Sequence, residues 1–362
     1  MEQLLEMGCQ DVYVTPWRQD ARIRDAFSSM FEVAPHAFRK FRVASFVERF
    51  HRALVEEASD VVHFDVNMTE MFGYLTGREA SVISPSDSFT KMMLRMTRFA
   101  PGVARRVYTL TQAAKFWYVE RYFYPRFTKC HVVTEPEAEF LRRISPRSDL
   151  AVIPTGGDVP EHPREEQGRE VQPDVVFSGQ MNNPFTVDSA LWFCRSVWPR
   201  IRARAPECRL WLVGANPTPR IRALAHTDES VVVTGFVPDM VQALQDKAVY
   251  VCPLTYGVGI RTRLFEPMAY GIPVVTTRMG AEGIEVVHGE HVLVADDPGA
   301  FAEAVTALLG QPELRARLAR RAHELVKRRY TWEAYARGME RLYEEALRKR
   351  KADTDPRRVA WA

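Results

Sequence analysis

Residues 253–275 read Pro-Leu-Thr-Tyr-Gly-Val-Gly-Ile-Arg-Thr-Arg-Leu-Phe-Glu-Pro-Met-Ala-Tyr-Gly-Ile-Pro-Val-Val, and this segment is the most informative part of the chain. It follows the apolar run 249–251, which is typical of a buried strand. It then opens a helical stretch at 263–270 that leads to a second apolar run at 272–276. A strand, a glycine loop, a helix and another strand indicate a doubly wound parallel sheet, which binds ligands where its strands end.

The glycine loop in this stretch combines features that suit a diphosphate. Gly257 and Gly259 let the backbone approach a bulky anion because they carry no Cβ. The following helix presents free N–H groups and its positive dipole end, and Arg261 and Arg263 add two cations that can grip phosphate oxygens. Glu266, one turn further, is placed to accept hydrogen bonds from sugar hydroxyls such as those of ribose. Taken alone, the pattern is also compatible with a turn that carries solvated charges.

Short apolar runs alternate with longer helical stretches twice along the chain. The N-terminal half predicts strands at 11–14, 60–64, 81–84, 130–134 and 151–154, and helices at 38–58, 105–124 and 135–144. The C-terminal half predicts strands at 174–177, 209–213, 231–234, 249–251 and 272–276. It predicts helices at 187–205, 240–245 and 263–270, and a last helical stretch at 312–351 that is interrupted near 329–332. We therefore predict an α/β protein with two Rossmann-like, doubly wound parallel-sheet domains.

The composition changes at 155–168, which is rich in glycine, proline and charged residues and is typical of a linker. We predict an N-terminal domain over 1–155, a linker over 156–172 and a C-terminal domain over 173–335. For residues 336–362 we predict a C-terminal helix followed by a tail. This segment could return to the N-terminal domain. A length of 362 residues supports two such cores.

The overall composition, 46% hydrophobic and 26% charged, excludes a disordered or fibrous chain. Five scattered cysteines without CxxC spacing predict neither a disulfide framework nor a zinc site, and they fit a reducing compartment. The chain has no run of about 18 apolar residues and no signal peptide. We therefore expect a cytoplasmic protein.

The charge is unevenly distributed, with nine basic side chains and one acidic side chain, Glu120, between Lys91 and Lys129. This stretch could attract a phosphorylated substrate or the anionic inner surface of a membrane, but we favour the other interpretation, a solvated helix face. Aromatic residues interleave with it at 116–124. That pattern permits nucleic-acid stacking, membrane docking or a core-facing helix. We favour the core-facing helix and expect no nucleic-acid partner.

The 253–275 stretch resembles the retaining GT-B glycosyltransferases of family 4, the glycosyl transferases group 1. It is most similar to the branch whose motif runs GxGTRxKxxEAMAxGxPVV. The similarity continues through 278–283, 288–297 and 329–333, and 177–181 with 187–188 is similar to that branch's FxGxMxxxPNxDA segment. Residues 233–239 resemble its strand and loop at the base pocket. The resemblance covers 174–345.

The resemblance implies a metal-independent transferase without a bound cofactor. Its donor would be a nucleoside-diphosphate sugar of the UDP or GDP type, and the acceptor a hydroxyl of a saccharide, a lipid-linked compound or a small molecule. The sugar would be transferred with retained configuration, in polysaccharide, glycolipid or natural-product glycoside synthesis. By position, the residues that bind the donor are Gly259, Arg261 and Arg263 for the diphosphate, Glu266 for the ribose, and Gly235, Phe236 and Val237 for the base.

Three departures from the family pattern concern the C-terminal site. Val258 stands where many members have the first of two glutamates, which weakens any inference about the donor sugar. The stretch 179–184 lacks the arginine and lysine that the wider family places there, so Arg261 and Arg263 carry more of the phosphate binding. Pro267 replaces an alanine, and we expect a helix that begins near 262–263 with a local distortion.

The N-terminal half matches the family less closely. His63 aligns with the first histidine of the family's DVVHxH strand end, but Asp65 replaces the second. His63 is therefore either a residue near the sugar and acceptor or a satisfied structural histidine. Asp87, in a short polar motif at 86–88, is either an acceptor contact or a helix N-cap. The chain also begins where the family's first helix should end, so a shortened N-terminus is expected.

Two functions of different classes remain open from the sequence. The first is the glycosyltransferase, with the two arginines stabilising the leaving diphosphate and with His63 and Asp87 as the candidates on the acceptor side. The second is a catalytically impaired GT-B subunit that binds nucleotide or a partner protein, which the absent second histidine and the missing first strand would favour.

Overall fold

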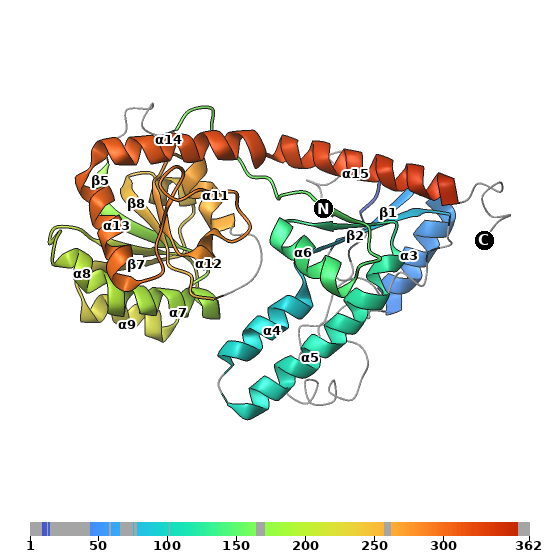
Figure 1. The fold of residues 1–362 in the computed structure, drawn as a ribbon, viewed down its shortest axis with the longest axis horizontal. Coiled ribbons are helices and arrows are strands. Elements are labelled where there is room, and N and C mark those ends of the chain that lie inside the picture. The colour runs from blue at the N-terminus through green and yellow to red at the C-terminus, as the bar shows by residue number, and fades with distance from the viewer. Residues whose placement is uncertain are drawn as a thin grey trace. The chain divides into compact units, whose positions relative to one another are not determined.

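A computed structural model of the chain describes residues 9–12, 14, 44–57, 59–65, 75, 78–100, 102–163, 171–256 and 262–353. Its internal contacts divide the chain into two units. Unit 1 comprises 1–132, 138–151 and 341–362, and unit 2 comprises 133–137 and 152–340. Each unit contains one sheet with helices packed against it, and the predicted α/β fold with two parallel sheets is confirmed (Figure 1).

Unit 1 is built on a four-stranded sheet in the order β1-β2-β3-β4. The pairs β1–β2 and β2–β3 are parallel, and the two central strands β2 and β3 are almost wholly buried, as expected for a sheet covered on both faces. The strands are β1 (Val61–Asp65), β2 (Ala80–Ser86), β3 (Lys129–Val132) and β4 (Leu150–Val152), and the helices are α3 (Ala44–Glu57), α4 (Phe89–Phe99), α5 (Val103–Tyr122), a 3₁₀ turn (Tyr124–Arg126), and parts of α6 (Glu135–Ile144) and α15 (Trp332–Asp353).

Helices α4 and α5 form an antiparallel hairpin. The Phe89 ring stacks on the Phe116 ring at 5.0 Å between centroids. Nearer the turn, the Thr97 hydroxyl donates to the Thr109 hydroxyl at 2.7 Å. Figure 1 shows the two helices side by side, with their joined ends extending away from the sheet.

Glu120 on α5 anchors the N-terminus of α4. Its buried carboxylate accepts hydrogen bonds from the Ser88 hydroxyl at 2.9 Å and from the Thr90 backbone N–H at 3.2 Å. Burial raises its pKa to about 7, although these hydrogen bonds oppose the shift. The one acidic residue of the basic stretch is thus an internal anchor and not a surface charge.

Replacement of Glu120 should alter how stability depends on pH. In the unfolded chain this carboxyl ionises near its ordinary pKa of 4.5, whereas in the folded chain it stays protonated up to about 7. The folded state therefore loses stability as the pH rises through this interval, by roughly 1 kcal/mol or more. We expect the melting temperature of Glu120→Gln to fall less between pH 5 and pH 8 than that of the wild type, in buffers matched in ionic strength. The exposed control Glu139→Gln should follow the wild type, and an equal fall in both variants would contradict the assignment.

Unit 2 is built on a six-stranded parallel sheet in the order β10-β9-β8-β5-β6-β7. The order reverses at β5, which lies between β8 and β6, and doubly wound sheets bind ligands at such a switch point. The strands are β5 (Gln172–Ser178), β6 (Leu210–Val213), β7 (Val231–Gly235), β8 (Lys247–Cys252), β9 (Val274–Thr276) and β10 (Leu293–Val294). The helices are α7 (Pro184–Trp192), a π-helical turn (Phe193–Val197), α8 (Trp198–Arg202), α9 (Pro219–Thr227), α10 (Met240–Leu244), α11 (Thr262–Ala269), α12 (Arg278–Ala281), α13 (Pro298–Gly310) and α14 (Pro312–Arg329).

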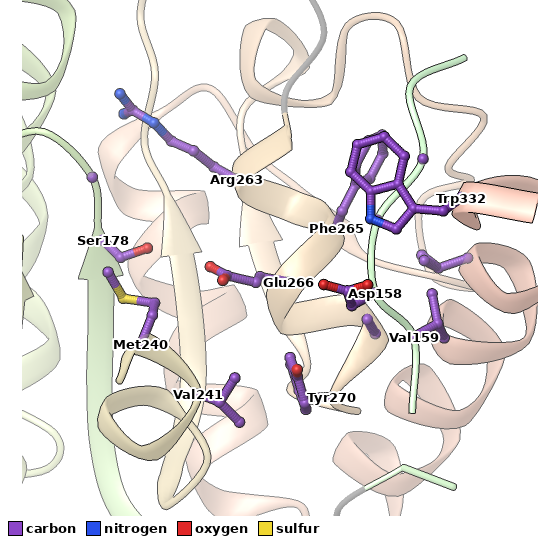
Figure 2. Close-up of a pocket in the computed structure, with 15 residues that line it drawn as sticks. Asp158, Val159, Ser178, Met240, Val241, Arg263, Phe265, Glu266, Tyr270 and Trp332 are labelled. Atoms are coloured by element: carbon purple, nitrogen blue, oxygen red, sulfur yellow. The ribbon is translucent and has the colours of Figure 1, made fainter. Parts of the chain in front are cut away.

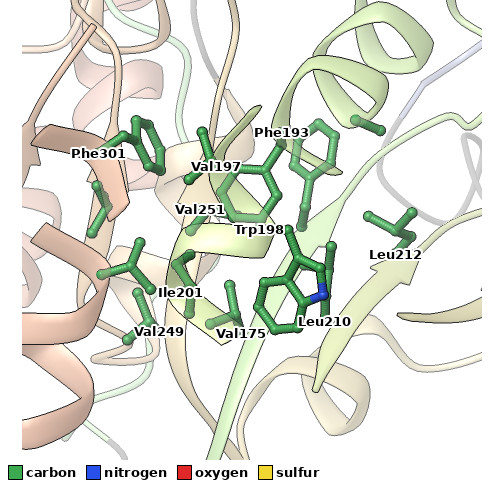
Figure 3. Close-up of a cluster of buried hydrophobic side chains, with 14 of the residues drawn as sticks. Val175, Phe193, Val197, Trp198, Ile201, Leu210, Leu212, Val249, Val251 and Phe301 are labelled. Carbon is green, nitrogen blue, oxygen red and sulfur yellow. The ribbon is translucent and has the colours of Figure 1, made fainter. Parts of the chain in front are cut away.

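Alternate residues of the unit 2 strands supply two separate cores. Val175 and Phe177 of β5 face one core, which Trp198 and Phe301 fill from the helices (Figure 3). Val176, between them, faces the other core, beneath α11 and α14. This period of two places helices on both faces of the sheet.

The structure corrects several expectations. Asp11, Val12 and Val14 are described and are not in strand conformation, so the strand predicted at 11–14 is wrong for them. The predicted helix at 38–58 is described from Ala44 to Glu57, and residues 38–43 lie outside the described residues. Helices α4, α9 and α13 were not predicted. Helix α9 is short and α13 is apolar on two sides, so periodicity is less informative there, whereas the apolar residues of α4 do recur at helical spacing.

Candidate functional site

Unit 2 contains a cavity of about 490 Å³ that begins where β5 ends (Figure 2). Ser178 and Gly179 border it on the sheet side, and α10, α11 and the start of α15 complete the wall. Its lining residues are Gly156, Gly157, Asp158, Val159, Ser178, Gly179, Met240, Val241, Arg263, Phe265, Glu266, Ala269, Tyr270, Val326 and Trp332. It therefore brings together Arg263 and Glu266, two of the residues that the sequence predicts for the donor.

Arg263 is the cation of this cavity within the described part of the chain. Its guanidinium donates through Nη2 to the Thr186 hydroxyl of α7 at 2.7 Å. Its Nη1 is buried and has no hydrogen-bond partner among the described residues. Because a buried N–H without an acceptor is unfavourable, this group is prepared for an anion.

Two glycines make room for the guanidinium. A Cβ on Gly179 would lie 2.9 Å from the Arg263 Cζ, so any larger residue would displace that side chain. A Cβ on Gly214, at the end of β6, would lie 1.8 Å from the Gly179 carbonyl oxygen. The backbones that leave β5 and β6 therefore touch directly, and Arg263 lies over the point of contact. Residues 179–184 contain no arginine or lysine, and Arg263 of α11 places a cation next to them instead.

Glu266 extends from the same helix into the cavity, while Arg263 extends toward the end of β5 (Figure 2). Glu266 forms no ion pair with any described residue, and partial desolvation in the cavity raises its pKa. Asp158 lies in the same wall. The cavity therefore holds carboxylate acceptors beside a half-buried cation, as a ligand with both hydroxyl groups and negative charge requires.

The floor of the cavity is fixed by a buried hydrogen bond. The Ser178 hydroxyl lies 3.0 Å from the Tyr250 hydroxyl of the neighbouring strand β8. Burial raises the pKa of Tyr250, so this phenol stays neutral. The pair closes the cavity toward the sheet without adding charge.

The predicted diphosphate loop begins at a fixed point. Tyr256, the last residue described before it, donates a hydrogen bond from its hydroxyl to Asp188 of α7, and its ring packs edge-on against Phe185. Gly259 and Arg261 lie outside the described residues, so their roles stay predictions.

Helix α11 begins at Thr262, as expected, and contains Pro267 at its sixth position. The proline ring removes the N–H that would bond to the Arg263 carbonyl. The C-terminal end of the helix is held from α14, where His323 Nδ1 lies 2.6 Å from the Ala269 carbonyl oxygen and donates to it. Pro267 therefore lies inside α11, and α14 holds the C-terminal end of that helix.

The predicted linker contributes to the cavity. Gly157 donates a backbone hydrogen bond to the Tyr330 carbonyl at 2.9 Å. A Cβ on Gly156 would lie 2.7 Å from the Thr331 carbonyl oxygen and from the Trp332 backbone, so Gly156 fits closely against the junction of α14 and α15. Gly156, Gly157 and Asp158 were not expected in the site, because glycine in a polar stretch is typical of a mobile connection.

The residues predicted for the base lie next to the cavity. Gly235 ends β7, Phe236 is exposed, and Val237 packs against the core beneath α11. None of the three is among the lining residues, whereas Met240 and Val241, at the start of the next helix, are. Base recognition by 235–237 stays a prediction. Met240 and Val241 were not predicted as site residues, because the sequence of this short helix has no pattern that indicates a binding role.

His63 lies within a polar chain in unit 1. Its Nδ1 is 2.7 Å from the Tyr343 hydroxyl and its Nε2 is 2.7 Å from the Ser84 hydroxyl, which in turn lies 2.8 Å from His131 Nδ1. Burial lowers the His63 pKa, so its neutral form is favoured. Both ring nitrogens have partners, and a role for His63 toward an acceptor stays a prediction.

Asp87 does not cap α4. The N-cap is Ser88, whose hydroxyl accepts a hydrogen bond from the Lys91 backbone N–H at 3.2 Å, so the alternative in which Asp87 is the cap is wrong. A role for Asp87 toward an acceptor stays a prediction.

Known proteins resemble this chain at two levels. Residues 172–311, the core of unit 2, match the family model described as glycosyl transferases group 1. A phosphatidyl-myo-inositol mannosyltransferase of Mycobacterium leprae (strain TN) is 31% identical over 175 residues, which cover 47% of this chain and 46% of that protein. The chain thus spans about half the length of such curated relatives or less.

Solved structures resemble a larger share of the chain. Sucrose-phosphate synthase from Thermosynechococcus elongatus superposes with a TM-score of 0.64 at 19% identity, over 83% of this chain and 77% of that one. Anabaena HepE, in complex with UDP and glucose, superposes with a TM-score of 0.60 at 14% identity, over 87% and 84%. At such identities the likeness establishes the fold, and it confirms the GT-B architecture that the sequence resemblance implied.

Proposed function

We propose that the protein is a glycosyltransferase that moves a sugar from a nucleoside diphosphate to an acceptor hydroxyl, with retention of configuration and without a metal ion. The observation that carries the proposal is the buried Arg263 Nη1, which has no partner among the described residues and lies at the C-terminal end of β5. A diphosphate oxygen is an acceptor that satisfies this donor and neutralises its charge. The group 1 match over 172–311 and the mannosyltransferase relative support the same chemistry.

The proposed reaction takes place on one face of the sugar. The bond between the anomeric carbon and the diphosphate breaks, and the acceptor oxygen forms the new bond on the same face. The acceptor proton passes to the departing diphosphate. Arg263, Arg261 and the N-terminal N–H groups of α11 stabilise the charge that develops on this leaving group, because preorganised donors act most strongly where charge appears.

Glu266 is proposed to bind the ribose hydroxyls of the donor, since it extends into the cavity and has no competing cation among the described residues. We expect Glu266→Ala to bind UDP or GDP about ten- to a hundredfold more weakly, through the loss of charge-assisted hydrogen bonds. Isothermal titration calorimetry measures this loss. The matched control Glu313→Ala, an exposed glutamate of α14, should bind like the wild type.

A ligand without ribose hydroxyls separates this role from a structural one. Wild type and Glu266→Ala should bind a dideoxyribonucleoside diphosphate equally, since the interaction is then absent from both. If the variant loses the same factor toward this ligand, Glu266 does not bind the ribose.

A ligand screen tests the donor class. UDP, GDP, ADP and their sugars are each added in excess, and a ligand that binds only the folded state raises the melting temperature. We expect a shift with UDP or GDP and with the corresponding sugar. A flat response to every nucleotide would overturn the proposal, and binding without transfer to any acceptor would favour the impaired subunit.

Two further measurements address the course of the reaction. Retention is read from the anomeric configuration of the product by proton NMR, and an inverted product would contradict the one-face mechanism. Metal independence requires that the turnover rate stay unchanged after treatment with EDTA.

A further inference from the structure

The α4–α5 hairpin of unit 1 carries an exposed apolar face that the proposed reaction does not use. Val103, Val107, Leu110 and Trp117 of α5 are 78%, 46%, 49% and 41% exposed. With the exposed Ala114 they recur every three or four residues, so they form one stripe along the helix. We call this stripe, together with Phe99 at the turn, the hairpin face.

The opposite side of α5 already packs against its neighbours. The buried residues Thr109, Ala113, Phe116 and Glu120 face α4 or the sheet, and Phe116 and Glu120 contact the α4 N-terminus. Helix α5 is therefore apolar on two sides, although only one of them faces the interior. A surface helix normally places polar residues on its outer side, and a contiguous exposed apolar stripe indicates an interaction site.

The exposed apolar residues are concentrated on this element. Of the thirteen large hydrophobic side chains that are exposed in the described part of the chain, eight belong to α4 and α5. These eight are Leu94, Phe99, Val103, Val107, Leu110, Trp117, Tyr118 and Tyr122. Scattered exposure would not produce this concentration.

The charge around the hairpin face has one sign. Arg98, Arg105 and Arg106 are exposed within a few residues of the turn. Glu120 is the only acidic residue of α4 and α5, and it is buried. The surface of the hairpin therefore presents apolar side chains among cations, with no carboxylate to oppose them.

We propose that the hairpin face docks on the surface of a bilayer that contains anionic lipids. Phe99 and Val103 at the turn enter the boundary between head groups and acyl chains, and the neighbouring arginines contact the lipid phosphates. A peripheral contact fits the helices, since none of those described has the length and apolarity to cross a bilayer. Single-stranded RNA is less suitable, because Val103, Val107 and Leu110 of the stripe are aliphatic and offer no ring on which a base could stack.

Vesicle sedimentation of the full chain tests this proposal. We expect the protein to sediment with vesicles of phosphatidylcholine mixed with phosphatidylglycerol, to bind vesicles of phosphatidylcholine alone more weakly, and to dissociate as salt is added. Val103→Asp combined with Val107→Asp should weaken binding about tenfold or more, because two apolar contacts become charged. Both side chains are exposed, so the fold is retained, which circular dichroism checks.

Matched controls use the same substitutions elsewhere. Val55→Asp changes an exposed valine of α3 and should leave binding unchanged. Arg98→Glu and Arg105→Glu should each weaken binding about fivefold or more, whereas Arg317→Glu on α14 should not.

Three results would overturn the proposal. They are failure of the wild type to bind anionic vesicles, binding that survives the double valine substitution, and a hairpin-dependent dimer or RNA complex in place of vesicle binding. None of these results tests the donor cavity in unit 2. The proposed transferase activity and the proposed membrane docking can therefore be contradicted independently.

Discussion

Replacement of Arg263 by alanine should lower the transfer rate by about a hundred- to a thousandfold, since it removes a preorganised donor from the leaving diphosphate. The guanidinium lies directly against Gly179, and its Nη2 donates a hydrogen bond to the Thr186 hydroxyl. Its Nη1 is therefore oriented before any ligand arrives. Nucleoside diphosphates should also bind more weakly to the variant, as calorimetry measures.

Stability separates this role from a structural one. Among the described residues, truncation removes only the hydrogen bond to Thr186, so we expect the free energy of unfolding to change by about 1 kcal/mol or less. Arg263→Lys should recover part of the rate, because it keeps the charge and loses the planar fork. The exposed control Arg317→Ala should keep the wild-type rate. Wild-type turnover in Arg263→Ala would remove this residue from the mechanism.

Replacement of Gly214 by alanine should destabilise unit 2 by about 3 kcal/mol or more, because two backbones would have to separate. The new Cβ would lie 1.8 Å from the Gly179 carbonyl oxygen, and backbone atoms cannot rotate away as a flexible side chain does. The same shift would move Gly179 from Arg263, so nucleotide binding should also fall. Urea denaturation and calorimetry measure the two effects.

The control for this substitution is Gly289→Ala. Gly289 has a positive φ of 78°, and a Cβ there meets no atom within 4 Å. Its replacement carries only the conformational penalty, about 1 kcal/mol. Equal destabilisation of the two variants would show that the contact between the β5 and β6 ends is not tight.

Much of the architecture could be predicted because buried parallel strands are short apolar runs. The stretches at 174–177, 209–213 and 249–251 lie within β5, β6 and β8 or extend them by one residue. Helix α6 has the predicted ends. Periodicity is less informative where a helix is apolar on two sides, as α13 is, or short, as α9 is.

The site could be predicted only in part, for a geometric reason. Arg263 and Glu266 were found because they lie in one short motif with a recognisable spacing. The close packing of Gly179 and Gly214 beneath Arg263 could not be predicted. The two glycines follow different strands, and a contact between distant backbones leaves no local sequence pattern. Gly156 and Gly157 predicted a flexible linker, whereas the structure places them at the cavity. Glycine suits a closely packed backbone as well as a flexible turn.

The proposed transferase depends on the binding of the donor diphosphate to Arg263 in the unit 2 cavity. A crystal structure of the protein with UDP or GDP would show this contact. We predict diphosphate oxygens within hydrogen-bonding distance of Arg263 Nη1 and the ribose hydroxyls at Glu266. A nucleotide bound elsewhere, or a cavity left without nucleotide at saturating ligand concentration, would show that Arg263 does not bind the diphosphate.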